Sequence, residues 1–199
     1  MKKLSVVLLF AGIGMMQACN NSASDDSVAK ADSTNDTRDT TSVMDQKDST
    51  SGMGINDDVA DFAVKAANGG MMEVKMGEYA SKNAMDKSVK DFGAMMVKDH
   101  TKANDELKGI ATSKNIAIPA TVGQDMTDKM NDLMKKTGKD FDKAYMNSMV
   151  DDHKDDIDEF QKEADNSKDS TVKNFAAKTL PTLKKHLDAA QAIVKSHNY

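Results

Sequence analysis

The sequence has few of the residues on which several common functions depend. It contains one cysteine, two prolines and no tryptophan among 199 residues, and aromatic residues make up only 5%. A single cysteine excludes a disulfide within the chain. No glycine-rich phosphate loop, Ser–His–Asp pattern or Cys–His pattern is recognisable. These absences favour a protein that is not an enzyme, although one kind of enzyme stays open as an alternative below.

The charge balance also limits the partners. The formal net charge is −5, from 27 lysines and arginines against 32 aspartates and glutamates. The sequence has no basic stretch interleaved with aromatic residues, which is the pattern typical of nucleic-acid binding. We therefore expect no nucleic-acid partner. The sequence does not decide the protein partners or the oligomeric state, and a homo-oligomer is one of the states that stay open.

The N-terminus has the features of an export signal. Two lysines precede an apolar stretch that ends at Met16 and is too short for a typical transmembrane helix. Ala18 then precedes Cys19, a spacing that resembles the lipobox of bacterial lipoproteins. We predict a lipoprotein signal peptide over residues 1–18 and a lipid anchor on Cys19; the alternative is a plain signal peptide and a structural cysteine. The anchor predicts an outer-membrane lipoprotein of the cell envelope, facing the periplasm or the cell surface.

Residues 19–54 have the composition of a flexible segment. They are rich in serine, threonine and aspartate, contain no aromatic residue and almost no large aliphatic one. Such a segment buries too little apolar surface to offset the entropy lost on ordering. We predict a disordered tether between the lipid anchor and the domain that follows.

Residues 55–199 have the composition and patterning of one all-α domain. Alanine, lysine, methionine, aspartate and leucine are abundant, and apolar residues recur every three or four positions in four long segments. Short turns join the segments in pairs, and about 25 residues separate the pairs. We predict a ferritin-like up-down four-helix bundle with an extra short helix in the crossover. The first long helix is expected over 57–83, and the second from a Ser88/Asp91 capping box to near 114. The third runs from the break at 137–138 to about 166, and the fourth begins after a cap at Asp169 or Ser170. The short helix covers about 122–136.

Each long helix carries one ionisable residue near the middle of its apolar stripe. At 1.5 Å per residue, the four positions differ by only about one turn in their distance from the connecting turns. Antiparallel packing would therefore bring one carboxylate and three imidazoles into a single layer of the core. Nitrogen and oxygen donors inside a bundle are typical of a metal site. These candidate ligands are Glu73, His100, His153 and His186.

Three aspartates extend the candidate site. Asp99 and Asp152 each precede a histidine within a repeated Met-Val-x-Asp-His pattern, and we interpret them as acceptors that orient imidazoles. Asp156 lies three residues after His153 on nearly the same face, so it is a fifth candidate ligand or a solvated surface charge. Iron, copper and zinc are the candidate ions. Several nearby methionines, which either fill the core or suit copper(I), keep copper among them.

Four stretches of the sequence resemble one family. They cover residues 69–77, 99–107, 145–153 and 180–187, and the resemblance extends over nearly all of 56–195. It is to the DUF4142 family of exported bacterial proteins. The resemblance implies a ferritin-like helical fold and an outer-membrane location, but no function. The Glu-x-x-His motif of ferritin-like di-iron proteins is not present.

Three functions stay open. The first is a metal-binding envelope protein for storage, buffering or stress protection. The second is a structural or interaction module in which the inner polar residues form a closed hydrogen-bond network without metal. The third is a metal-dependent oxidoreductase, which would need an open coordination position on the ion.

Overall fold

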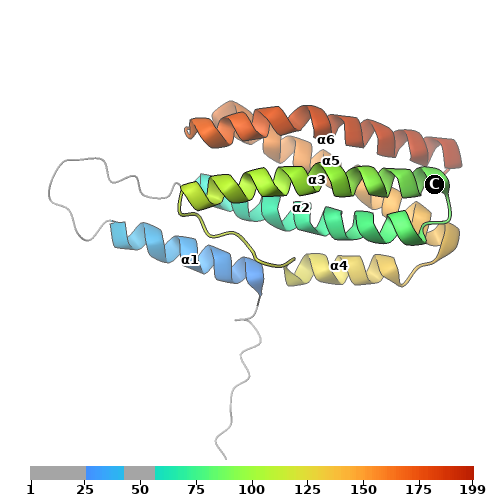
Figure 1. Cartoon of the computed structure of the whole chain (residues 1–199), viewed down its shortest axis with the longest axis horizontal. Coiled ribbons are helices and arrows are strands. Elements are labelled where there is room, and N and C mark those ends of the chain that lie inside the picture. The colour runs from blue at the N-terminus through green and yellow to red at the C-terminus, as the bar shows by residue number, and fades with distance from the viewer. Residues whose placement is uncertain (1–25, 43–56) are drawn as a thin grey trace, which may run out of the picture.

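Helices are the only regular elements in the computed structural model, which describes residues 26–42 and 57–199. Four long helices run side by side, and two shorter ones lie against one side of them (Figure 1). The all-α class is therefore confirmed, and α4 is the short helix expected in the crossover. The helices are α1 (Ser27–Ser42), α2 (Asp57–Asn83), α3 (Lys87–Ser113), α4 (Gln124–Met134), α5 (Gly138–Asn166) and α6 (Ser170–His197).

The long helices form two hairpins. α2 packs along α3, α5 packs along α6, and the hairpins meet where α3 contacts α6 and α2 contacts α5. A buried carboxylate also joins them, because Asp142 of α5 accepts hydrogen bonds from the backbone N–H groups of Met85 (3.0 Å) and Asp86 (2.7 Å) in the α2–α3 turn. This contact links one end of the second hairpin to the turn of the first.

Aspartates begin two of the long helices. Asp169 accepts from the N–H groups of Thr171 and Val172, so it caps α6 as predicted. The predicted capping box at the start of α3 is wrong. Asp86 caps α3 by accepting from Ser88 N, and Asp91 pairs with Lys87 instead. An aspartate two residues nearer the turn satisfies the free N–H groups equally well, which a motif search centred on serine does not distinguish.

Two glycines set the separation of α2 and α3. A Cβ atom on Gly77 would lie 2.7 Å from the carbonyl oxygen of Gly93, and a Cβ on Gly93 would lie 2.7 Å from that of Gly77. No real Cβ tolerates such a contact, so the backbones approach closely only because both residues are glycine. This crossing holds the first hairpin tightly together.

The bundle core has two ends of different composition. The phenylalanine end packs Phe62, Phe160 and Phe175 with aliphatic side chains of all four long helices. The methionine end contains the buried side chains of Met72, Met76, Met96, Met146 and Met149, together with Phe92, Phe141 and Tyr145.

Helix α1 corrects part of the predicted tether. Residues 27–42 are helical and lie on α2, with Ala31 and Asn35 buried. The Asn35 amide donates to Ala117 O (2.9 Å) and accepts from Ala117 N (2.7 Å), which satisfies backbone groups of the segment after α3. Ser27 Oγ likewise accepts from the N–H of Ala120 (2.8 Å). The prediction failed because it counted apolar burial, whereas α1 is held largely by polar side chains bonded to an irregular backbone.

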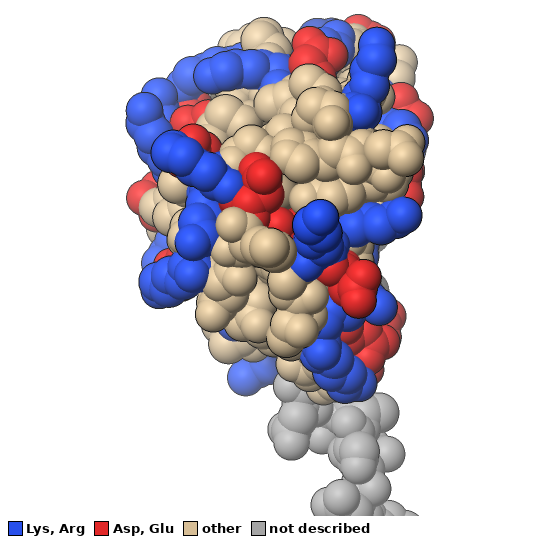
Figure 2. All heavy atoms as spheres, turned by 90° about the vertical axis from the view of Figure 1, so that its right-hand side faces the viewer, with Lys and Arg blue, Asp and Glu red and all other residues tan. Residues whose placement is uncertain are grey.

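Other N-terminal predictions lie outside the described residues. They are the signal peptide, the lipid anchor at Cys19, and the tether residues on either side of α1. Within 26–42 and 57–199, no helix combines the length and apolar character needed to cross a membrane. Figure 2 looks onto the end of the bundle that carries the C-terminus, where Lys and Arg side chains are mixed with Asp and Glu side chains and with other residues.

Candidate metal centre

The four predicted inner residues lie in one buried layer between the two ends of the core. Glu73 of α2 is 2% exposed, His100 of α3 is 6% exposed, and His153 of α5 and His186 of α6 are fully buried. Each helix contributes one of them, because each residue takes a position on the apolar stripe of its own helix. The structure thus brings the predicted carboxylate and all three imidazoles together.

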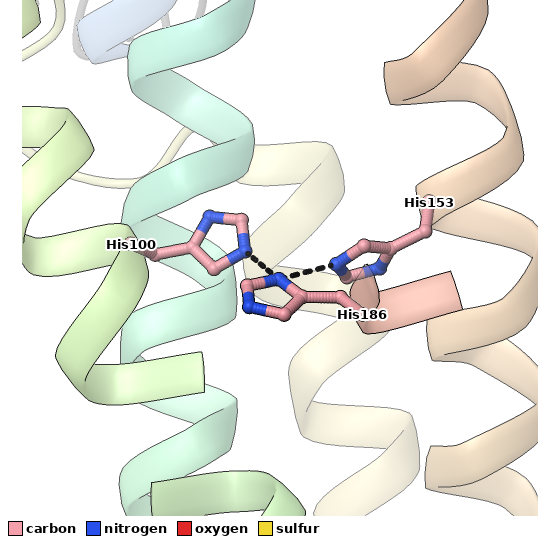
Figure 3. A group of neighbouring side chains, drawn as sticks. All are labelled: His100, His153 and His186. Carbon is pink, nitrogen blue, oxygen red and sulfur yellow. Dashed lines mark hydrogen bonds between the residues drawn. The ribbon is translucent and has the colours of Figure 1, made fainter. Parts of the chain in front are cut away.

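The three imidazoles point at one another (Figure 3). His186 Nδ1 lies 3.2 Å from His153 Nε2 and 3.3 Å from His100 Nε2. One nitrogen from each ring lies within 4.8 Å of the other two, so the three form a compact set of donor atoms. Two nitrogens bound tetrahedrally to one metal at about 2.0–2.1 Å would be about 3.3 Å apart. The spacing in the structure therefore suits three ligands of a single ion.

The other ring nitrogens face acceptors. His153 Nδ1 lies 2.9 Å from the carbonyl oxygen of Met149, and His186 Nε2 lies 3.1 Å from a carboxylate oxygen of Asp99. A carbonyl or an ionised carboxylate only accepts, so both of these nitrogens carry protons. In a neutral imidazole the opposite nitrogen is then bare. His153 Nε2 and His186 Nδ1 therefore face each other with two lone pairs.

Glu73 lies beside the imidazoles. Its Oε2 atom is 2.8 Å from His100 Nδ1, which orients that ring and leaves His100 Nε2 directed at His186. Its Oε1 atom is 3.5 Å from His153 Nδ1 and has no hydrogen-bond partner among the described residues. Asp156, the fifth predicted ligand, forms a second compact donor set with Glu73 and His153.

A family model matches residues 44–193, which is most of the chain, under the description "Domain of unknown function (DUF4142)". The chain belongs to the DUF4142 family. This confirms the family expected from the sequence. The curated proteins and the solved structures that were searched contain no match to it.

Burial controls the protonation of this DUF4142 site. Desolvation lowers the pKa of His153 and of His186 and lowers that of His100 to about 4, so burial favours neutral imidazoles. Desolvation also raises the pKa of Glu73 to about 7, with the neighbouring charge of His153 opposing the rise. The pKa of Asp156 is raised, mainly by desolvation and then by the charge of Glu73. A cation in the layer would offset the cost of ionising these carboxylates.

The two predicted orienting aspartates differ in their contacts. Asp99 does bond an imidazole, but on another helix, because its side chain points across the α3–α6 contact to His186. Asp152 contacts no imidazole; it pairs with Lys129 of α4 and lies 3.2 Å from Ser148 Oγ. Neighbouring residues on a helix point about 100° apart, so neither aspartate reaches the histidine next to it. Sequence reasoning missed the Met149 carbonyl, since every buried helical histidine has such a carbonyl four residues before it.

The DUF4142 bundle also contains a cavity of about 30 Å³ beside the imidazoles. His100, His186, Glu73 and Asp156 form the part of its wall nearest the donor layer. Its opposite wall is uncharged and includes Phe160 and Phe175 of the phenylalanine end. The sequence held no signal for this space, since it depends on how rings from two helices pack.

Proposed function

We propose that this protein binds one transition-metal ion through His100, His153 and His186. The observation that carries the proposal is the 3.2 Å separation of His153 Nε2 and His186 Nδ1, two nitrogens whose rings each face an acceptor with their other nitrogen. Two facing lone pairs repel unless a cation lies between them. A proton would serve, but burial lowers the pKa of both imidazoles and opposes it. A metal ion suits the same position.

The surroundings of the imidazoles support the proposal. Histidines that bind metals usually donate their other N–H to a carboxylate or a backbone carbonyl, which fixes the ring and strengthens the ligand. His153 has the Met149 carbonyl, His186 has Asp99, and His100 has Glu73 in that place. On this proposal Glu73 and Asp99 orient ligands. Glu73 and Asp156 also supply negative charge that balances the ion.

The donor type limits the choice of ion, and the proposed purpose is one that needs only binding. Three imidazoles suit zinc, copper or iron, and the methionine end beside them keeps copper(I) among the candidates. The description "Domain of unknown function" assigns no reaction. We propose storage, buffering or stress protection, which require only that the ion be held.

Elemental analysis of the full-length protein, purified without a histidine tag or chelator, tests the proposal. We expect close to one equivalent of iron, copper or zinc in the native protein or after titration. The double variant His153→Ala/His186→Ala should lose it. His197→Ala is the matched control, because this histidine is exposed at the end of α6 and lies outside the layer. Circular dichroism of each variant checks that the helices persist.

The competing function is a structural or interaction module of the envelope. It is favoured by the continuous chain of contacts from Glu73 through His100 and His186 to Asp99. In that case the purified protein contains no metal, refuses all three ions on titration, and holds a proton between two of the rings. Stoichiometric binding that depends on His153 and His186 would exclude this alternative.

We also propose that the protein is anchored in the cell envelope through lipid on Cys19, on the strength of the Ala18-Cys19 spacing after the apolar stretch. A Cys19→Ser variant tests it. Membrane fractionation and mass spectrometry of the N-terminal peptide should show a lipidated, membrane-bound native protein and an unlipidated variant. An unmodified Cys19 in the native protein would contradict the anchor.

A further inference from the structure

The cavity beside the donor layer lies where an exchangeable ligand of the ion would be placed. It is formed by all four long helices, beside His100 and His186 and on the side of the phenylalanine end. At about 30 Å³, it has room for about two atoms of the size of a water molecule. His100 and His186 contribute to its wall, so an ion held by the imidazoles would border this space.

The chemistry of the wall favours one class of occupant. Three carboxylate side chains, Glu73, Asp99 and Asp156, line the cavity, and no lysine or arginine is among the described lining residues. An anion would therefore meet carboxylates and no balancing cationic side chain from the described residues. The far side combines apolar side chains such as Leu107 and Phe160 with uncharged polar ones such as Asn104, and both kinds accept an uncharged guest.

One carboxylate oxygen of a lining residue has no hydrogen-bond partner among the described residues. Glu73 lines the cavity, and its Oε1 atom is buried without such a partner, with His153 Nδ1 3.5 Å away across the layer. Buried polar atoms without partners are rare in proteins and usually have a cause, such as a bound group. The unpartnered oxygen is thus a second observation that points to a missing bound group beside the imidazoles.

We propose that the cavity holds a small uncharged ligand, of the size of water, dioxygen or nitric oxide, at an open position of the ion bound by His100, His153 and His186. This inference rests on the proposed metal site and deepens it. Three protein nitrogens leave a tetrahedral ion one free position, which is how sites that exchange ligands differ from closed structural sites. The small volume excludes larger guests, and the carboxylates exclude anions.

Nitric oxide binding to the full-length, cobalt(II)-loaded protein tests the inference, because the visible and electron paramagnetic spectra of cobalt(II) report both the imidazoles and an added ligand. We expect nitric oxide to change both spectra saturably under anaerobic conditions. Azide, which is about as small but negatively charged, should bind at least about tenfold more weakly than to an aqueous three-imidazole cobalt complex.

Cavity-filling variants locate the ligand. Ala103→Leu on α3 and Ala66→Leu on α2 fill the space from two helices without altering a ligand. Each should keep one cobalt(II) and lose affinity for nitric oxide by at least about tenfold. Ala94→Leu is the matched control for the first, because Ala94 is exposed on the same helix, and it should bind nitric oxide as the native protein does.

The outcomes separate this inference from the metal site. If the protein holds cobalt(II) but its spectra ignore nitric oxide, Glu73 or Asp156 fills the fourth position and the inference is overturned while the metal site stands. If both filled variants that still fold bind nitric oxide normally, the ligand lies elsewhere and the inference is also overturned. If no cobalt(II), iron, copper or zinc binds at all, the proposed function fails and this inference fails with it.

Discussion

The two ends of the core solve the same packing problem with different side chains. At the phenylalanine end, Phe62 meets Phe160 edge to face with ring centroids 5.0 Å apart and meets Phe175 at 6.4 Å. At the methionine end, flexible thioethers such as those of Met76 and Met149 fill the space around larger rings. Planar rings have a fixed shape and leave gaps that flexible chains close. The cavity accordingly lies on the phenylalanine side of the donor layer.

The largest difference between the ends should appear when a ring is removed. Phe62→Ala removes a 2% exposed side chain that contacts two other rings, and it should cost about 3–5 kcal/mol of the free energy of unfolding. Denaturant unfolding followed by circular dichroism measures this. A loss below about 1 kcal/mol would show that this end collapses around the deleted ring, and that its packing is as adaptable as that of the methionine end.

At the methionine end, the backbone contact should be more sensitive than the side chains. Gly77→Ala would bring a Cβ within 2.7 Å of Gly93 O, so it should destabilise the protein by about 1–3 kcal/mol despite the helix propensity of alanine. Gly109→Ala is the matched control on α3, where an added Cβ meets nothing within 4 Å. It should stabilise by about 0.5–1 kcal/mol. Equal effects of the two changes in chemical unfolding would refute the tight crossing.

A smaller effect is expected from exchanging one methionine. Met76→Leu nearly conserves volume in a fully buried position and should cost less than about 1.5 kcal/mol in the same unfolding measurement. Phe62→Leu at the other end should cost more, because leucine leaves part of the space of the ring empty. If Met76→Leu proves the more costly of the two, the thioethers are specifically packed, and the proposed contrast in adaptability is wrong.

The smallest expected effect is a pH dependence at the exposed margin of the methionine end. His197 Nε2 lies 3.0 Å from Asp86 Oδ2. The hydrogen bonds of Ser88 lower the pKa of Asp86 to about 2. The stabilisation of the folded state by this carboxylate is therefore present above about pH 4 and is lost as the pH falls toward 2. The pKa of His197 is raised above 6.5 by its hydrogen bond to the Ile193 carbonyl and, to a smaller extent, by Asp86. The stabilisation of the folded state by protonated His197 is therefore complete below about pH 6.5 and is lost as the pH rises through the pKa of His197 in the folded protein.

Melting temperatures measured from pH 2 to pH 9 check this dependence. His197→Asn should remove only the loss of melting temperature seen as the pH rises above about 6.5. Asp86→Asn should weaken both the acidic and the alkaline pH dependence, while its amide oxygen still caps α3. A His197→Asn profile that follows the native one through the alkaline range would show that the contact does not persist in solution.

Periodicity predicted the long helices well. The first was expected over 57–83 and is observed as Asp57–Asn83, because its apolar residues recur without interruption and a polar turn follows. The common layer of the ionisable residues was also predictable, since offsets from the short turns that differ by only about one helical turn place residues at similar heights. The proton positions on the imidazole rings could not be predicted from the sequence. They depend on which acceptor each ring faces, and Asp99 reaches His186 only through the packing of α3 on α6.

Helix α1 shows a different limit. Its composition of serine, threonine, aspartate and lysine gives no apolar stripe, so sequence rules that measure burial predict disorder. What it does have is partners, because the backbone of residues 115–121 offers donors and acceptors that Ser27, Asn35 and Arg38 bond. Such complementarity belongs to two segments far apart in the chain, and neither segment reveals it alone.

The contact of Asp142 with the α2–α3 turn has a consequence for how the protein assembles. Each hairpin is made of neighbouring helices, so each can form through local contacts before the two meet. Asp142 can accept from Met85 and Asp86 only after they have docked. It therefore acts late, on the native side of the folding barrier. Asp142→Asn should leave the refolding rate nearly unchanged while unfolding becomes faster, which makes this carboxylate a determinant of the lifetime of the folded state.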